Sequence, residues 1–135
     1  MTSVLHEGRR NVEWILSAYD LVYSTDEMQV DAVATHQSGT LLGVTTATGV
    51  AVPWNPALAG DAQDGSQVLA GILYRQIDGD STLAAGSSVK AAVVTRGPVE
   101  ASSSNGRIPY PAGYTFAQVK AALAALGGGG IVLRD

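Results

Sequence analysis

The sequence contains no cysteine and only two histidines, His6 and His36. The absence of cysteine excludes disulfide bonds, thiolate nucleophiles and thiolate metal ligands. Two isolated histidines cannot supply the usual ligand set of a zinc site. The acidic segment "GDAQDG" at 60–65 lacks the spacing and the distal bidentate glutamate of a calcium loop. We therefore expect neither a metal nor a cofactor.

Basic residues and long apolar segments are also scarce. Lys and Arg number 8 against 12 Asp and Glu, which gives a net charge of −4, whereas binding to nucleic acid needs clustered cations. The longest uncharged stretch, residues 36–60, is interrupted by glycines and two prolines and does not fit a membrane span. Glu7, Arg9 and Arg10 interrupt the N-terminal segment, so it does not fit a secretory signal. We expect a soluble protein, made in the cytoplasm, that binds neither nucleic acid nor membrane.

The length of 135 residues is typical of one domain with one hydrophobic core. Residues 1–11 are polar and aperiodic, a composition that leaves a chain terminus mobile unless something ties it down. Most of the remaining chain combines short runs of β-branched residues with turn residues, as strands do. The sequence predicts an N-terminal arm over residues 1–18 and a single β-rich domain over residues 19–135.

An apolar patch lies at the end of the predicted arm. Val12, Trp14 and Leu16 alternate with Glu13 and Ile15, which is the pattern of a strand. The contrast between a polar start and this patch predicts an arm that is mobile in the free protein. We expect it to become ordered on a partner by adding a strand to the edge of the partner's sheet.

Residues 68–77 are predicted to form a strand between two Asp-Gly turn signals. Leu73, Arg75 and Ile77 share one face of this strand, and both faces are largely apolar. Such a strand needs cover on both sides. We expect a neighbouring subunit to cover the second face in a symmetric homo-oligomer.

One helix is predicted, over residues 115–126. Thr115 is its expected N-cap, with Gln118 completing a capping box, and alanine favours the helical conformation. Its apolar stripe consists of Phe116, Val119, Leu123 and Leu126. Four glycines at 127–130 end the helix and lead into a last strand, "IVLRD". The expected fold class is therefore mainly β (α+β), with one C-terminal helix.

A hydrolase is one alternative, because Gly79, Asp80 and Ser81 resemble the nucleophile block of the Gly-Asp-Ser hydrolases. A serine nucleophile needs a histidine base and a group that orients this base. The two histidines available are His36 and His6, and His6 lies in the predicted arm. We favour a simple turn at this position and expect no enzyme.

Five segments in the order "RNVEWILS", "SGTLLGVTTATGVAVPWNP", "DGSQVLAGILYRQID", "AAVVTRGPV" and "AALAALGGGGIVLRD" carry a family resemblance. Over about residues 10–135 the sequence resembles the head decoration proteins of tailed bacteriophages, the lambda-type capsid-stabilising family. The order of these motifs carries the resemblance, because no single segment is a chemical signature. Residues 19–28 match least well, so their path is not predicted.

The resemblance implies a small β-tulip-like domain with an extended N-terminal arm. It implies a homotrimer that binds the major capsid protein at three-fold sites on the outer surface of the mature head and resists the pressure of packaged DNA. The expected site residues are Val12, Trp14, Ile15 and Leu16 in the capsid-binding arm, and Leu73, Arg75 and Ile77 at the subunit interface.

A second alternative is a β-rich, virion-associated binding module that contacts carbohydrate or the phage tail. In this interpretation Trp54 and Tyr110 are exposed platforms on which sugar rings stack.

Overall fold

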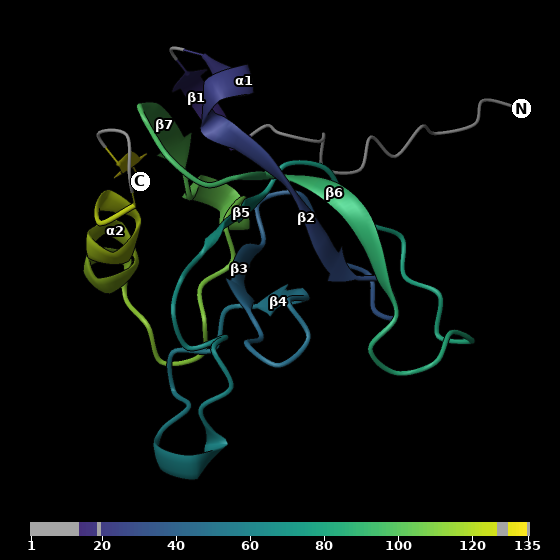
Figure 1. Ribbon diagram of the computed structural model, residues 1–135. Coiled ribbons are helices and arrows are strands. Elements are labelled where there is room, and N and C mark those ends of the chain that lie inside the picture. The colour runs from purple at the N-terminus through teal and green to yellow at the C-terminus, as the bar shows by residue number, and fades with distance from the viewer. Residues whose placement is uncertain (1–13, 19, 127–129, 135) are drawn as a thin grey trace, which may run out of the picture.

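Five strands form a closed barrel in the computed structural model, which describes residues 14–18, 20–126 and 130–134 (Figure 1). The barrel strands are β2 (Thr25–Asp31), β3 (Leu41–Val44), β4 (Ala51–Pro53), β5 (Gly71–Leu73) and β6 (Ser88–Val94). Their order is β2-β4-β3-β5-β6, and β6 closes the barrel by pairing antiparallel with the whole of β2. Closure leaves these strands without a free sheet edge.

A second sheet has the order β1-β7-β8. Its strands are β1 (Ile15–Ala18), β7 (Val99–Ser102) and β8 (Ile131–Arg134), and a short helix, α1 (Leu21–Ser24), connects β1 to β2. Strand β1 is antiparallel to β7, whereas β8 is parallel to it. Helix α2 (Phe116–Ala124) lies against β8 (Figure 1) and covers one face of this sheet.

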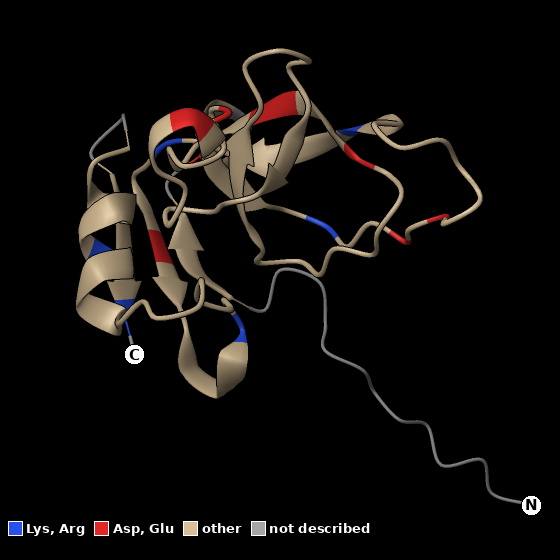
Figure 2. Ribbon diagram, turned by 90° about the horizontal axis from the view of Figure 1, so that it is seen from below, with Lys and Arg blue, Asp and Glu red and all other residues tan. Residues whose placement is uncertain are grey.

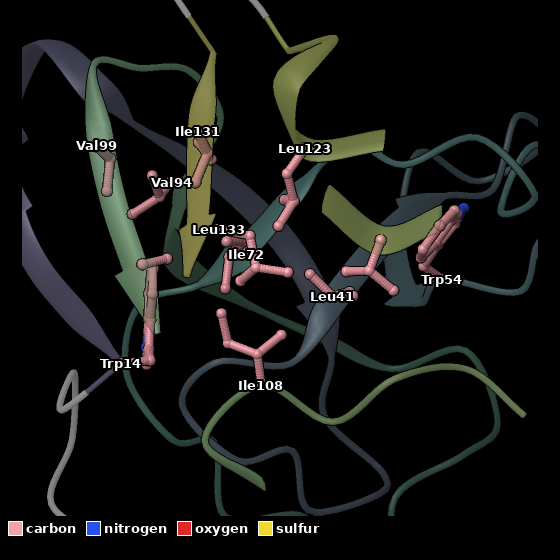
Figure 3. Close-up of a cluster of buried hydrophobic side chains, with 12 residues drawn as sticks. Trp14, Leu41, Trp54, Ile72, Val94, Val99, Ile108, Leu123, Ile131 and Leu133 are labelled. Carbon is pink, nitrogen blue, oxygen red and sulfur yellow. The ribbon is translucent and has the colours of Figure 1, made fainter. Parts of the chain in front are cut away.

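The main hydrophobic core lies between the second sheet, helix α2 and the barrel (Figure 3). Its buried members are Trp14, Leu41, Trp54, Ile72, Val94, Val99, Ala101, Ile108, Val119, Leu123, Ile131 and Leu133. A smaller cluster fills the barrel and consists of Val30, Leu42, Ala51, Leu73 and Val93. Strand β5 separates the two clusters, since Ile72 belongs to the first and Leu73 to the second.

The predicted fold class is confirmed: the domain is mainly β with a C-terminal helix. The predicted helix is present, with the capping box of Thr115 and Gln118 and with Val119 and Leu123 fully buried. The last strand is also present as β8. These elements follow from local signals, because capping and helical periodicity act within a few residues.

The prediction for residues 68–77 is wrong in length and in its cover. Strand β5 contains only residues 71–73, and Ile77 forms only an isolated bridge with His36. Both faces of β5 are covered by this chain, because Ile72 and Leu73 are fully buried in different clusters. Two apolar faces therefore indicate a strand between two cores, and β5 needs no neighbouring subunit to cover it.

The predicted arm ends within the domain. Trp14 is fully buried in the main core, and its Nε1 donates a hydrogen bond to Ser38 Oγ at 2.9 Å. Residues 15–18 form strand β1, which pairs with β7. The structure therefore places residues 14–18 on the body of the domain, whereas residues 1–13 lie outside the described residues.

An ion pair joins β2 to the segment that follows β6. The Arg96 guanidinium donates to both carboxylate oxygens of Asp26, at 2.8 and 3.0 Å, and Thr95 Oγ1 donates to the same carboxylate. These hydrogen bonds, with that from Arg96 the strongest, lower the pKa of Asp26 from 3.8 to about 2. Arg96 also lies 5.1 Å from the centre of the Tyr23 ring.

Asp26→Asn is expected to lower the free energy of unfolding at pH 7 by about 0.5 to 1 kcal/mol, a small effect because solvent screens this half-exposed pair. The folded pKa is depressed, so the contribution of the pair is present above pH 3.8 and is lost as the pH falls toward 2. Thermal unfolding of both proteins between pH 2 and 7 measures this. Glu27→Gln is the matched control, since Glu27 and its partner Lys90 are 72% and 65% exposed. A difference between Asp26→Asn and wild type that persists undiminished at pH 2 would contradict the assignment.

Candidate functional site

The residues of the hydrolase hypothesis are not assembled in the described part of the chain. Ser81 is exposed, and no hydrogen bond joins it to His36. His36 is buried, and its Nε2 lies 2.9 Å from Asp31 Oδ2. His6 lies outside the described residues.

The residues that the structure describes contain no group of three or more His, Cys, Asp or Glu side chains that could bind a metal ion. None of their helices is long and apolar enough to cross a bilayer. Lys and Arg are scattered singly along the ribbon (Figure 2).

Trp54 and Tyr110 are not exposed platforms, and this prediction is wrong. Trp54 is buried, donates from Nε1 to Gln67 O at 2.9 Å and packs edge-on against Tyr114 at 5.5 Å between ring centroids. Tyr110 is half-buried, and its hydroxyl donates to Ser103 Oγ at 2.6 Å. Because both rings pack against the main core, the observation that supported sugar binding is lost.

The uncovered face of the second sheet offers one interaction surface. We call it the outer sheet surface and define it by Leu16, Ser17, Pro98, Glu100 and Val132. Leu16 is 50% exposed and Val132 42%, while a groove of about 380 Å³ is lined by Ser17, Pro98, Glu100 and Val132, among others. Exposed apolar side chains around a groove are typical of a protein contact.

Strand β1 lies at the edge of this sheet, directly after residues 1–13. In the order β1-β7-β8, β1 pairs with β7 on one side and has no partner among the described strands on the other. Its free backbone groups can therefore pair with an added strand. The register with β7 shifts between Ile15 and Ser17, and Leu16 occupies this irregularity. Of the predicted arm residues, Leu16 therefore faces solvent, Ile15 is half-buried, Trp14 is buried and Val12 lies outside the described residues.

A larger groove lies beside β6, and we call it the β6 groove. Its volume is about 690 Å³, and it is lined by Ala32, Arg75, Gln76, Ile77, Asp78, Asp80, Leu83, Ser88, Val89, Lys90, Ala91 and Ala92. Leu83 and Val89 are each 42% exposed. Two of the predicted interface residues, Arg75 and Ile77, lie here, whereas Leu73 is fully buried inside the barrel.

Backbone hydrogen bonds hold the 78–87 loop, which forms one wall of the β6 groove. The Asp80 N–H donates to Ala32 O, and the Ala32 N–H donates to Ser87 O, each at 2.9 Å. The Gly79 N–H donates to Thr35 Oγ1 at 3.0 Å. This wall is therefore fixed to the turn that follows β2.

The Asp31 carboxylate organises that turn. It accepts hydrogen bonds from the backbone N–H groups of Val33 and Ala34 and lies beside the His36 ring. Burial raises the pKa of Asp31, but the hydrogen bond with His36 and those from Ala34 and Val33 outweigh burial and hold the pKa below its usual range.

Val132, Leu83 and Val89 are exposed apolar residues that were not predicted from the sequence. The predicted C-terminal strand contained a signal for Val132, because alternation places it opposite the buried Ile131 and Leu133. No local signal marks Leu83, since its exposure depends on how the 78–87 loop returns to the barrel.

Comparison with known proteins gives one family. A family model described as bacteriophage lambda head decoration protein D matches residues 4–131. The search of curated proteins gave no significant match.

Proposed function

The chain belongs to the family of bacteriophage lambda head decoration protein D, and from this premise we propose that it is a cement protein of the mature head. The family is one of structural capsid proteins and not of enzymes, and it places the chain on the capsid of a phage virion. In our proposal the protein binds the outer surface of the head as a homotrimer at three-fold sites. There it opposes the pressure of packaged DNA.

The family match carries this proposal, and the outer sheet surface supports it. The major capsid protein is the proposed partner because it forms the repeated surface of a phage head. Leu16 and Val132 offer exposed apolar contacts, and one edge of β1 is unpaired among the described strands. A trimer would present three copies of this surface with the symmetry of a three-fold site.

We propose that residues 1–13 act as the capsid-binding arm and that β1 is its point of attachment. Val12 lies at the end of this arm, and Ile15 and Leu16 continue the contact on the domain. Trp14 acts indirectly in this proposal: its ring is buried in the main core and holds β1 in position for the contact. The proposed subunit-interface residues are Arg75 and Ile77, which line the β6 groove.

The test is binding of the purified protein to heads prepared without it. We expect saturable binding to expanded heads, little binding to unexpanded heads and an increase in the temperature at which DNA-filled heads rupture. Cosedimentation and a rupture assay measure these effects. Equal binding to both kinds of head, without added strength, would contradict a cement role. Binding to purified tails instead would support a tail-associated module.

A further inference from the structure

The 78–87 loop forms one wall of the β6 groove although none of its side chains is buried. Residues 80–86 are all exposed, and Asp78, Asp80 and Leu83 line the groove. Segments with little buried apolar surface open locally at a low cost in free energy. The position of the loop, and with it the shape of the groove, therefore depends on where the loop is attached.

The loop is attached to the turn of residues 31–36. The backbone of Ala32 exchanges hydrogen bonds with both ends of the loop. The two backbones also lie in direct contact, because a Cβ atom added at Gly79 would lie 2.2 Å from the carbonyl carbon of Ala34. A displacement of the turn therefore displaces the loop.

One carboxylate and one imidazole hold the turn together. The Asp31 carboxylate accepts hydrogen bonds from the N–H groups of Val33 and Ala34, at 3.4 and 3.3 Å. It also lies 2.9 Å from His36 Nε2, and because a carboxylate only accepts hydrogen bonds, Nε2 is the donor in this contact. His36 is buried, and its backbone exchanges two hydrogen bonds with Ile77. Removal of the charge on Asp31 therefore weakens three contacts of the turn at once.

We propose that Asp31 and His36 form an acid-sensitive latch that holds the 78–87 loop in place and so fixes one wall of the β6 groove. Protonation of Asp31 converts one acceptor oxygen into a hydroxyl donor and removes the charge that strengthens the other hydrogen bonds. The turn then loses its shape and releases the loop. The two hydrophobic clusters remain packed, because the loop contributes no residue to either of them.

The latch opens in acid. Burial raises the pKa of Asp31, but the hydrogen bond with His36 and those from the turn outweigh burial and hold the pKa below its ordinary value of 3.8. A depressed pKa in the folded protein means that the contribution of Asp31 is present above pH 3.8 and is lost as the pH falls through the lower value. The groove therefore has a fixed wall at neutral pH and a released wall in acid.

A second carboxylate, on the loop itself, also has a lowered pKa. The Asp80 carboxylate accepts hydrogen bonds from the hydroxyl and the N–H of Thr82, and these lower the pKa of Asp80. Both bonds lie within the loop, so their loss changes its local conformation and not its attachment to the turn. Asp78, Arg75 and Lys90 are the other charged residues that line the groove. Asp80 is therefore the group whose titration the experiment has to separate from that of Asp31.

The test is amide hydrogen exchange of the full chain, followed by NMR between pH 6 and pH 2. Protection factors are compared, so that the intrinsic pH dependence of exchange cancels. In the wild type, protection of the Ala32 and Asp80 amides should fall by about 10-fold or more in acid. Asp31→Ala should show this low protection already at pH 6. The Ser102 amide, which donates to Trp14 O in the second sheet, should keep its protection at pH 6 in both proteins.

Two control variants identify the responsible carboxylate. Asp64→Ala is the matched control, because Asp64 accepts hydrogen bonds from Ser66 in a similar turn between β4 and β5. It should leave the protection of the Ala32 amide as in the wild type. Asp80→Ala should retain the fall in Ala32 protection in acid, since it leaves the turn of residues 31–36 intact.

The variants at pH 6 decide the matter even if the wild type unfolds at pH 2. Wild-type protection of the Ala32 amide in Asp31→Ala would overturn the latch, and so would loss of its acid dependence in Asp80→Ala. Asp31→Asn keeps the size of the side chain and removes its charge. If Asp31→Ala and Asp31→Asn both lost protection at Ser102 as well, Asp31 would support the whole domain and not the loop alone, which would also overturn the latch.

Discussion

Trp14→Ala is expected to lower the free energy of unfolding by about 3 to 5 kcal/mol, the range for removing a large aromatic side chain from a core. Trp14 is fully buried and packs in the same cluster as Ala101 and Leu133. Truncation leaves a cavity and also removes the donor to Ser38 Oγ. Ser38 still donates to Tyr74 O, so the loss is mainly one of packing. Denaturant unfolding measures the change.

Two variants separate the causes of this effect. Trp14→Phe keeps most of the apolar contact but not the indole N–H, and we expect a loss of about 1 to 2 kcal/mol. Leu16→Ala, two residues along the same strand, should change stability by about 0.5 kcal/mol or less, because Leu16 is half exposed. If Trp14→Ala were as mild as Leu16→Ala, Trp14 would not be a core residue and would be available to bind a partner.

The contrast between Trp14 and helix α2 shows what a sequence can predict here. The capping box and the stripe of α2 lie within residues 115–126, so the local pattern alone predicts them. Alternation around Trp14 also predicts a strand, and β1 begins at the next residue. The pattern cannot show that this strand pairs with β7, about 85 residues later in the chain. The sequence therefore predicted the conformation of the segment but not its burial.

The same limit explains the outcome for the predicted interface residues. A period of two places Leu73, Arg75 and Ile77 on one face of a strand, but β5 ends at Leu73. Leu73 then faces the closed barrel, while Arg75 and Ile77 lie on the β6 groove. Closure depends on the pairing of β2 with β6, which neither strand encodes locally. The end of β5 therefore leaves Arg75 on the exposed groove, whereas Ile77 lines the groove and also packs against the barrel cluster that contains Leu73.

Deleting residues 2–11 is expected to abolish binding to expanded heads while leaving a folded, self-associating domain. The deletion retains Trp14 and β1, so the described core is intact. A longer deletion through residue 16 would remove Trp14 and destabilise the fold, which would confuse loss of binding with loss of structure. Cosedimentation with heads measures binding, and thermal unfolding with sedimentation equilibrium checks the domain.

The expected loss is about 100-fold or more, because three arms act together. Fixing about ten residues costs roughly 1 to 2 kcal/mol each, which nearly offsets the strand hydrogen bonds and apolar contacts of a single arm. After one arm of a trimer has bound, the others bind at high effective concentration, which can add 10²- to 10⁴-fold. Leu16→Asp in the full chain should weaken binding less than the deletion, because it disturbs only the attachment on the outer sheet surface. Replacement of residues 2–11 by a Gly/Ser segment of equal length should abolish binding as the deletion does. If the replaced protein still protects heads from rupture, the domain is the anchor and the arm is not.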